Sequence, residues 1–330
     1  MKLFFFLIVF GLVAGGGVAW WSGQPLQMEK KTVEFSVGPT DGAAGVARKL
    51  AEAGVTTSPT LLQTWLTLTG QASRFKKGSY ELRPNDTPRS LLRKLVRGEF
   101  GMRSVRIGEG WNIRQVRAAM RDAEDLRHDS GALSDTTLMQ KLGAPEGTKA
   151  EGMFFPDTYK YARNTSDLDI LKLAYDTMQR KLDAAWQSRD MDLPLETPYE
   201  LLKLASIVEK ETGYGPDRTL VSAVMVNRLR INMRLQTDPT VIYGMGEAYD
   251  GNITRADLQR DTPYNTYTRL GLPPTPIAMP SEAALAAAAN PADSKALYFV
   301  SRNDGTGASE FSENLEAHNR AVRKYILKRP

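Results

Sequence analysis

Two glutamates, Glu209 and Glu211, lie at the end of the apolar segment Leu201–Thr212 and have the side chains best suited to acid chemistry. A helix-start signal precedes the segment, with Thr197 as the capping hydroxyl and Pro198 at the first helical position. Partial burial at the edge of an apolar helix face disfavours the ionised form of a carboxyl group and raises its pKa. A general acid that works near neutral pH needs a pKa raised in this way.

Helical periodicity separates the two glutamates. At about 100° per residue, the apolar face contains Leu204 and Val208, and Glu211 lies on one edge of that face. Glu209 lies on the opposite edge, where it can position or tune the acid. This geometry favours Glu211 only slightly over Glu209 as the candidate general acid. The alternative is that both are surface residues in the last turn of a core helix.

The segments 227–244 and 262–277 combine amides, hydroxyls, aromatic rings and arginines in Pro- and Gly-rich sequence. Such sequence is typical of ordered loops around a cleft, and this mixture of groups suits a sugar chain. Turn formation is the alternative explanation for Asp238 and Asn265. The predicted substrate-binding residues are Glu209, Asn227, Arg228, Arg234, Gln236, Thr237, Asp238, Tyr243, Tyr264, Asn265 and Tyr267.

Four separated motifs resemble those of the endolytic murein transglycosylases, the MltG or YceG-like family. They lie at residues 205–212, 234–244, 264–267 and 151–159, in the order expected of the family. The resemblance covers most of the chain beyond residue 100. In that family the second glutamate of the Glu-Lys-Glu triplet is the catalytic acid, and the corresponding residue here is Glu211.

The resemblance implies cleavage of the β-1,4 bond between N-acetylmuramic acid and N-acetylglucosamine within nascent peptidoglycan strands, which leaves 1,6-anhydro ends. Ordinary glycosidases use two carboxyl groups. One is sufficient here, because the muramic acid supplies its own 6-hydroxyl as the nucleophile. The family also acts close to the membrane and is associated with wall synthases, so we expect peptidoglycan strands and wall synthases as partners.

Composition is compatible with a protein that acts outside the cytoplasm. Cysteine is absent, and the net charge is +5. A basic chain suits an anionic partner, but no nucleic-acid-binding signature accompanies the charge, so we expect no nucleic-acid partner. Neither His128 nor His318 belongs to a metal or serine-hydrolase motif. We therefore expect no metal and no cofactor.

The amino terminus carries a continuous apolar stretch, Leu3–Trp21, with Lys2 before it and no charged residue after it until Glu29. The stretch is long enough to span a bilayer and ends in the tryptophan pair Trp20–Trp21. We predict a cytoplasmic tip and an inner-membrane anchor over residues 1–24, with the rest of the chain in the periplasm. A signal peptide cleaved near residues 17–19 is the alternative.

The sequence pattern of residues 25–100 predicts a small domain. A strand is expected over 33–37, helices over 43–53 and 59–68, a hairpin-like piece at 77–82, and a helix that Asp86 or Thr87 caps and that runs to residue 97. The portion from Tyr80 to Leu95 resembles a LysM-like wall-binding module. A structural spacer is the alternative, because many small domains combine a strand with an amphipathic helix.

Residues 101–330 predict the catalytic domain. Helices are expected over 113–122, 167–188, 197–212, 218–230, 281–290 and 312–327, with a hairpin over 297–311. Helices separated from short antiparallel strands predict an α+β fold. The whole chain is thus expected to contain a transmembrane helix, a LysM-like module and an α+β catalytic domain.

Two other classes of function are compatible with parts of this pattern. A non-catalytic peptidoglycan-binding scaffold needs the polar loops but no acid on the helix edge. A membrane-attached wall-assembly protein needs the amino-terminal segments and tolerates loss of the cleft. Analysis of glycan strands after incubation with the protein separates both from an enzyme.

Overall fold

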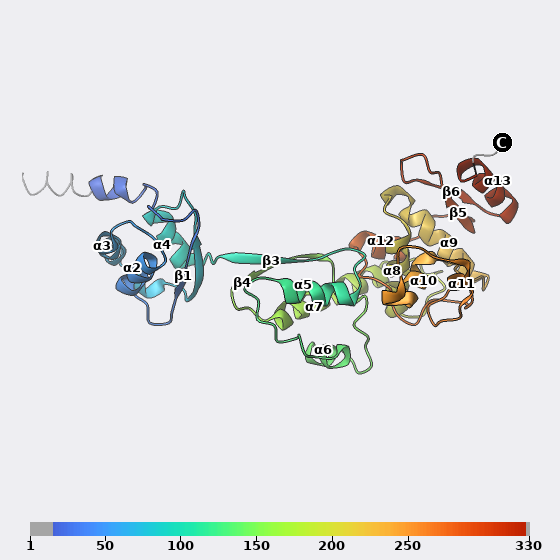
Figure 1. Cartoon of the computed structure of the whole chain (residues 1–330), viewed down its shortest axis with the longest axis horizontal. Helices are drawn as coiled ribbons and strands as arrows, with labels where there is room; N and C mark the ends of the chain where they lie inside the picture. The colour runs from blue at the N-terminus through green and yellow to red at the C-terminus, as the bar shows by residue number, and fades with distance from the viewer. Residues whose placement is uncertain (1–15, 328–330) are drawn as a thin grey trace, which may run out of the picture. The chain divides into compact units, whose positions relative to one another are not determined.

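The computed structural model describes residues 16–327, which Figure 1 colours along the chain. The described chain forms two compact units. Unit 1 contains the chain up to Arg103 together with Lys160–Asn164, and unit 2 contains Ser104–Tyr159 and the chain from Thr165 onwards. Both combine helices with short strands, so the α+β class is confirmed.

Unit 1 contains an antiparallel pair of strands, in which Phe35 lies opposite Tyr80. One helix packs against the first strand and another against the second. The Thr87 hydroxyl caps the last helix, as the sequence predicts. The elements are β1 (Val33–Val37), α2 (Ala43–Glu52), α3 (Pro59–Leu68), a 3₁₀ turn (Ala72–Arg74), β2 (Gly78–Leu82) and α4 (Pro88–Arg97).

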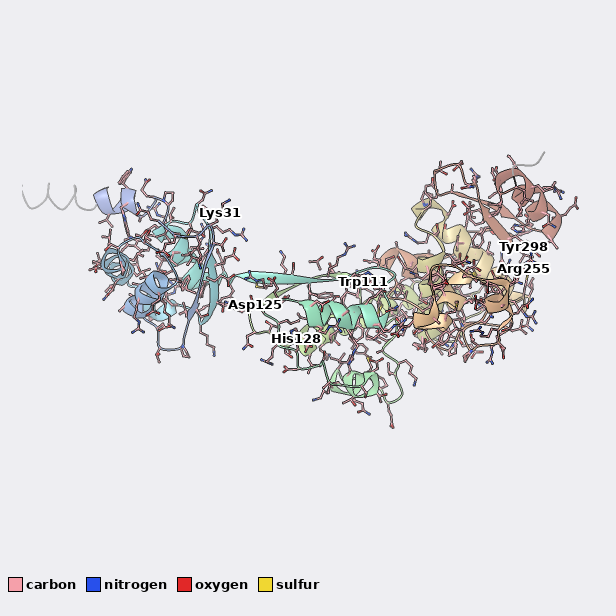
Figure 2. The ribbon with its side chains drawn as sticks, viewed as in Figure 1. Lys31, Trp111, Asp125, His128, Arg255 and Tyr298 are labelled. Carbon is pink, nitrogen blue, oxygen red and sulfur yellow. The ribbon has the colours of Figure 1, made fainter. Side chains whose placement is uncertain are left out.

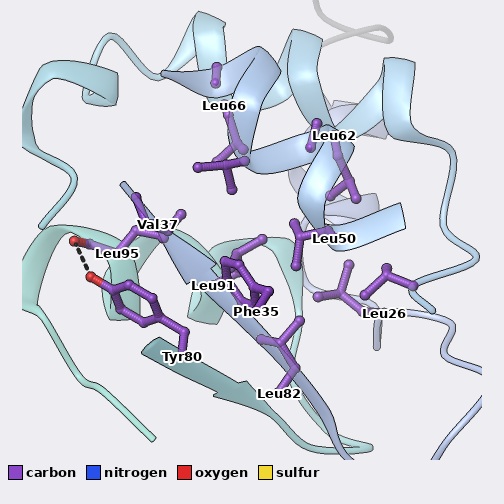
Figure 3. Close-up of a cluster of buried hydrophobic side chains, with 14 of the residues drawn as sticks. Leu26, Phe35, Val37, Leu50, Leu62, Leu66, Tyr80, Leu82, Leu91 and Leu95 are labelled. Atoms are coloured by element: carbon purple, nitrogen blue, oxygen red, sulfur yellow. Dashed lines mark hydrogen bonds between the residues drawn. The ribbon is translucent and has the colours of Figure 1, made fainter. Parts of the chain in front are cut away.

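Alternate residues of β1 and β2 point into the core of unit 1, which Figure 3 shows. The rings of Phe35 and Tyr80 stack with their centroids 5.6 Å apart. The Tyr80 hydroxyl donates to the carbonyl oxygens of Lys76, at 2.5 Å, and Leu95, at 3.3 Å. The buried phenol therefore keeps a hydrogen-bond partner inside an apolar core.

The helix α8 lies at the centre of unit 2, where it packs against α7, α9, α10 and α12 (Figure 1). The alanine-rich α12 presents small side chains to these neighbours, which permits close packing. The elements are β3 (Met102–Ile107), α5 (Ile113–Asp122), α6 (Asp135–Lys141), β4 (Asp157–Ala162), α7 (Asp167–Gln187), α8 (Pro198–Glu211), a 3₁₀ turn (Gly215–Asp217), α9 (Arg218–Arg230), α10 (Asp238–Met245), a 3₁₀ turn (Gly246–Ala248), α11 (Arg255–Gln259), α12 (Glu282–Ala289), β5 (Tyr298–Ser301), β6 (Ser309–Ser312) and α13 (Leu315–Tyr325).

The strands of unit 2 belong to two small sheets. β3 pairs with β4, and the boundary between the units falls within both strands. β5 and β6 pair antiparallel as the predicted hairpin, with Phe299 opposite Phe311, and α13 packs against both.

The predicted helices before and after the polar segments are confirmed to within a few residues. The polar segments themselves contain two short helices, α10 and α11, where sequence analysis predicted loops. Pro239 lies in the first turn of α10, where a proline costs no hydrogen bond. Pro239 was interpreted from the sequence as a loop signal, whereas in the structure it marks the start of α10.

The predicted membrane anchor falls mostly outside the described residues. Residues 16–21 are helical. Within residues 16–327, no helix has the length and apolar character to cross a membrane.

Candidate active site

The end of α8 places Glu211. The helix begins as predicted, with the Thr197 hydroxyl accepting a hydrogen bond from the Glu200 N–H at 3.2 Å. It ends because Thr212 takes an extended backbone, and the Thr212 hydroxyl then accepts the Tyr214 N–H at 3.0 Å. Glu211 is thus the last helical residue.

The apolar face of α8 is fully buried, and Glu211 lies at its edge beside a cleft of about 430 Å³. Residues from five separate stretches of unit 2 form the cleft, because α8, α9, the 235–238 segment, Tyr267 and the carboxyl-terminal hairpin with α13 converge there. The lining residues are Glu211, Arg228, Leu235, Gln236, Asp238, Tyr267, Tyr298, Phe299, Leu315 and His318.

Burial raises the pKa of Glu211 to about 7, in the direction that the helix pattern predicts. The negative charge of Asp238 raises it further, whereas the hydrogen bond from Thr237 and the positive charge of Arg228 lower it. A carboxyl group with this pKa is protonated in a large fraction of molecules at neutral pH, so it can donate a proton and then accept one.

Thr237 holds one oxygen of the Glu211 carboxyl group. The Thr237 hydroxyl donates a hydrogen bond to Glu211 Oε1. None of the described residues donates to Oε2, which leaves that oxygen for a ligand in the cleft. Thr237 is itself buried, and its N–H donates to the Thr266 hydroxyl at 3.1 Å. The Thr266 and Thr240 hydroxyls lie 2.9 Å apart. This threonine network joins the 234–244 and 264–267 motifs and orients the acid.

Gln236 lies in the cleft with a left-handed backbone, at a φ of 50°. Residues other than glycine adopt this backbone conformation at a free-energy cost of about 1–2 kcal/mol. The Gln236 N–H donates to the Thr266 carbonyl at 3.1 Å, which holds the strained residue in place. Gln236 directly precedes Thr237, whose hydroxyl donates to Glu211.

Arg228 forms one wall of the cleft and is 7% exposed. Its guanidinium donates to the carbonyl oxygens of Leu297, at 2.7 Å, and Leu235, at 2.8 Å. It also lies over the Tyr298 ring, 5.2 Å from the centroid. Arg228 thus ties the carboxyl-terminal hairpin to the cleft while contributing positive charge beside the acid.

Tyr267 and Asp238 form a polar pair on the exposed side of the cleft. The Tyr267 hydroxyl donates to Asp238 Oδ1 at 2.6 Å, and both residues line the cleft. Phenol and carboxylate groups next to each other are suited to binding sugar hydroxyls.

Five lining residues were not predicted from the sequence, namely Leu235, Tyr298, Phe299, Leu315 and His318. Tyr298, which Figure 2 labels, stacks on the His318 ring with centroids 5.2 Å apart. Burial, together with the charge of Arg228, lowers the pKa of His318, so its ring is neutral near pH 7. His318 Nδ1 is buried without a hydrogen-bond partner among the described residues. Only the packing of α13 against the hairpin brings this ring to the cleft.

Seven of the predicted binding residues are not among the cleft-lining residues, although Thr237 contacts Glu211 directly. They are Glu209, Asn227, Arg234, Thr237, Tyr243, Tyr264 and Asn265. Asn265 is 1% exposed, and its amide donates to the carbonyl oxygens of Leu258, at 3.0 Å, and Arg260, at 2.7 Å. The Asn227 amide donates to the carbonyl oxygen of Ser294 at 2.7 Å. These two amides support loops. Arg234 is exposed, and its carbonyl accepts from Arg228.

Glu209 binds the start of α12. Its Oε2 accepts hydrogen bonds from the Ser281 N–H, at 3.0 Å, and the Ser281 hydroxyl, at 2.5 Å. Ser281 caps α12. Glu209 therefore joins two core helices, and its carboxylate is engaged in that contact.

Tyr243, a residue of α10, and Tyr264 do not line this cleft, and their ring centroids lie 4.8 Å apart. The Tyr264 hydroxyl lies 2.9 Å from the Thr275 hydroxyl. The Tyr243 hydroxyl donates to Glu151 Oε2 at 2.9 Å, and Glu151 also accepts the Ile113 N–H at 3.1 Å.

Glu151, in the 151–159 motif, is a second buried acid that sequence analysis did not select. It is 5% exposed, and burial raises its pKa to about 7. Its partners come from the first residue of α5 and from α10, so it fastens these two helices together. No local pattern distinguishes it, because its neighbours in sequence do not form a helix face.

The chain matches the YceG-like family over residues 35–324, which is most of its length. It belongs to that family. The resemblance drawn from the four motifs is therefore confirmed. Among residues 16–327, no group of three or more His, Cys, Asp or Glu side chains is arranged to hold a metal ion.

Two kinds of relative are similar to the chain. The endolytic murein transglycosylase of Bacillus subtilis is 29% identical over 335 residues, which cover 96% of this chain and 91% of the relative. The enzyme of the same name from Streptococcus pneumoniae is 29% identical over 285 residues, and the match spans about half of its length, 51%. The crystal structure of a YceG-like protein from Listeria monocytogenes superposes with a TM-score of 0.54 and 25% identity, covering 88% of this chain and 99% of that one.

Proposed function

We propose that this chain is a lytic transglycosylase that cuts the β-1,4 bond between N-acetylmuramic acid and N-acetylglucosamine within peptidoglycan strands. The observation that carries the proposal is Glu211, a carboxyl group of raised pKa beside an open polar cleft. The relatives named endolytic murein transglycosylase support the same chemistry. As a lyase of this kind, the protein needs no cofactor.

The proposed reaction uses Glu211 twice. The protonated carboxyl donates to the glycosidic oxygen as the bond to the anomeric carbon breaks. The resulting carboxylate removes the proton from the 6-hydroxyl of the same muramic acid, whose oxygen attacks the anomeric carbon. One carbon–oxygen bond breaks and another forms, no water is consumed, and the product ends in a 1,6-anhydro ring. The carboxyl group of Glu211 is restored to its protonated form.

The surrounding residues support this cycle. Thr237 holds Oε1, which leaves Oε2 to donate the proton to the glycosidic oxygen in the proposed reaction. Arg228 and Asp238 shift the pKa of Glu211 in opposite directions, and burial is the larger effect. The substrate's own 2-acetamido group stabilises the positive charge that develops at the anomeric carbon. The Tyr267–Asp238 pair and the ring of Tyr298 line the same cleft, and in the proposed complex they bind neighbouring sugars.

Product analysis tests the proposal. The detergent-solubilised full chain is incubated with purified glycan strands, and the products are identified by mass spectrometry. We expect internal cuts with 1,6-anhydro ends. Reducing ends would overturn the intramolecular attack, because they require water as the nucleophile. Bound but uncut strands would favour a non-catalytic scaffold.

We also propose that residues 1–24 anchor the protein in the inner membrane, with the amino terminus in the cytoplasm and both units in the periplasm. The apolar stretch and the charge before it support this topology. A tether keeps the cleft within a bounded distance of newly made strands. A carboxy-terminal alkaline phosphatase fusion should be active and membrane-bound. Its recovery as a shortened soluble protein would show a cleaved signal peptide.

The LysM-like role of unit 1 and the contacts with wall synthases remain predictions from the sequence. Retention of unit 1 on insoluble peptidoglycan would support the first of them, and co-purification of a synthase with the full chain would support the second.

A further inference from the structure

A second cavity, which we call the α5–α10 pocket, lies in unit 2 and has a volume of about 430 Å³. It contains basic, amide and phenol side chains around an apolar floor. Its walls come from the turn before α5, the last turn of α8, the helix α10 and the turn that follows. Its polar side chains are Asn112, Arg114, Gln115, Lys210, Tyr243 and Tyr249.

The α5–α10 pocket and the cleft share two short pieces of backbone. Lys210 lines the pocket and Glu211 lines the cleft, and they are consecutive residues. Asp238 lines the cleft and Pro239 lines the pocket, and they too are consecutive. Neighbouring Cα atoms are about 3.8 Å apart, so the two cavities lie on either side of the same backbone.

The charge of the α5–α10 pocket is positive. Lys210 is exposed, and its ammonium lies 3.4 Å from the Gly110 carbonyl, which holds it at the rim. Arg114 is also exposed, and its ion pair with Glu247 is long, at 3.7 Å, with the Glu247 side chain 91% exposed. Such a pair breaks at little cost. Both cations are therefore available to bind carboxylate groups.

Two other carboxylates near the pocket are engaged elsewhere. Glu209 is bound to Ser281, and Glu151 is buried behind Tyr243.

Tyr243 and Tyr249 add flat apolar surface to the pocket, which suits the side chains of a short peptide. The Trp111 carbonyl accepts the Met279 N–H at 2.7 Å, which fixes the turn that carries Asn112 (Trp111 is labelled in Figure 2).

We propose that the α5–α10 pocket binds the carboxylate-bearing peptide branch of the glycan strand, with Lys210 and Arg114 contacting its carboxylates. This inference rests on the proposed function, because it takes the sugar in the cleft as the point from which the branch extends. Muramic acid carries its peptide on the lactyl group at C3 of the same sugar ring whose C1–oxygen bond is cut. The enzyme is thus selective for strands that still carry peptides.

The test compares three substrates that differ only in the branch: strands with free peptide carboxylates, strands whose carboxylates are amidated, and strands from which an amidase has removed the peptides. The full chain is assayed as wild type and as Lys210→Gln, Arg114→Gln and the double variant. Lys172→Gln, which removes an exposed charge from α7, is the matched control. The thermal midpoint of each variant is measured to confirm folding.

We expect the wild type to cut peptide-bearing strands with a kcat/KM at least about tenfold above that for the amidated strands, because charge-assisted hydrogen bonds have about that effect. In the double variant this ratio should fall to near one, while Lys172→Gln keeps it. An unchanged ratio in the double variant would overturn the peptide-binding inference. Wild type that cuts none of the three substrates would instead overturn the proposed function.

Discussion

Unit 2 contains two carboxyl groups, those of Glu211 and Glu151, whose pKa values burial raises to about 7. They differ in access. Glu151 is 5% exposed and receives hydrogen bonds from Ile113 and Tyr243, whereas Glu211 receives one from Thr237 and lines an open cleft. Both carboxyl groups have a raised pKa, so the pKa alone does not identify the proton donor. Access to a ligand distinguishes Glu211, the candidate donor, from Glu151, which holds two helices together.

The largest expected effect is the loss of catalysis in Glu211→Gln. Glutamine keeps the size and hydrogen-bonding reach of the side chain but cannot deliver a proton. The yield of anhydro-ended products should therefore fall by about 10²–10⁴-fold, the range typical of a general acid. Glycan binding and the thermal midpoint are measured alongside, and both should persist.

Glu151→Gln is the matched control, since it removes the other carboxyl group of raised pKa. It should retain turnover within about tenfold of wild type, because Glu151 supports α5 and α10 and does not face the cleft. If Glu151→Gln were the inactive variant and Glu211→Gln the active one, the assignment of the acid would be reversed.

The second expected effect is on the pH dependence of stability. Glu151 has a pKa of about 7 in the folded protein, against an ordinary value of 4.5. The Glu151 carboxyl group therefore binds its proton more tightly in the folded state than in the unfolded state. This contribution to the free energy of unfolding is complete below pH 4.5 and is lost as the pH rises through about 7. The loss is about 3 kcal/mol as an order of magnitude. Denaturant unfolding from pH 4.5 to 8 should show a shallower decline in Glu151→Gln than in wild type.

Tyr243→Phe sharpens this measurement. The Tyr243 hydroxyl lowers the pKa of Glu151 by hydrogen bonding to it, although burial is the larger effect. Its removal should move the loss of stability to higher pH. Identical curves for wild type and both variants would show that Glu151 does not titrate in this range.

The third expected effect is a shift in the pH profile of kcat/KM. Activity should decline as the pH rises through about 7, because Glu211 must be protonated in the free enzyme to act as the acid. Thr237→Val removes a hydrogen bond that lowers this pKa, so the decline should move to higher pH. Asp238→Asn removes a negative charge that raises it, so the decline should move to lower pH.

Asp261→Asn is the control for these shifts. Asp261 is an exposed carboxylate paired with Arg269 at 2.8 Å, and it does not line the cleft. Its profile should coincide with that of wild type. Shifts of the same sign in Thr237→Val and Asp238→Asn would contradict the assignment of the profile to Glu211.

The smallest expected effect is that of Glu209→Gln. Glu209 binds the Ser281 N–H and hydroxyl at the start of α12, where a negative charge stabilises the helix. Its loss should cost about 0.5–1 kcal/mol of folding free energy, seen as a thermal midpoint a few degrees lower, with measurable turnover retained. A loss of turnover as large as that of Glu211→Gln, in a variant that is still folded, would give Glu209 a direct role in the reaction.

Several elements of the site were predictable because their signals are local. Thr197 and Pro198 predict the start of α8, and the spacing of its leucines predicts which edge Glu211 occupies. The Thr237–Asp238 motif was also selected, and both residues contact the acid or line the cleft. The short helix α10, which begins there, was missed because Pro239 signals a loop as well as a helix start.

Other elements were not predictable, because their position depends on chain segments far apart in sequence. His318 comes to the cleft through α13 and the hairpin, although its own sequence reads as an ordinary terminal helix. Asn265 was selected as a sugar contact from its amide, yet its N–H groups donate to the backbone carbonyls of Leu258 and Arg260. The orientation of a side chain depends on its neighbours in space, and a motif does not encode them.

The sequence by itself determined the main helices, the α+β class, the family and the identity of the candidate acid, since caps, periodicity and motifs are properties of consecutive residues. The tertiary structure decided which polar groups meet. It brought Thr237 into hydrogen-bonding contact with Glu211, brought Ser281 into contact with Glu209, and buried Glu151 behind Tyr243. The physical reason is that burial and hydrogen bonding set the pKa and the access of each carboxyl group, and both arise only when distant segments pack together.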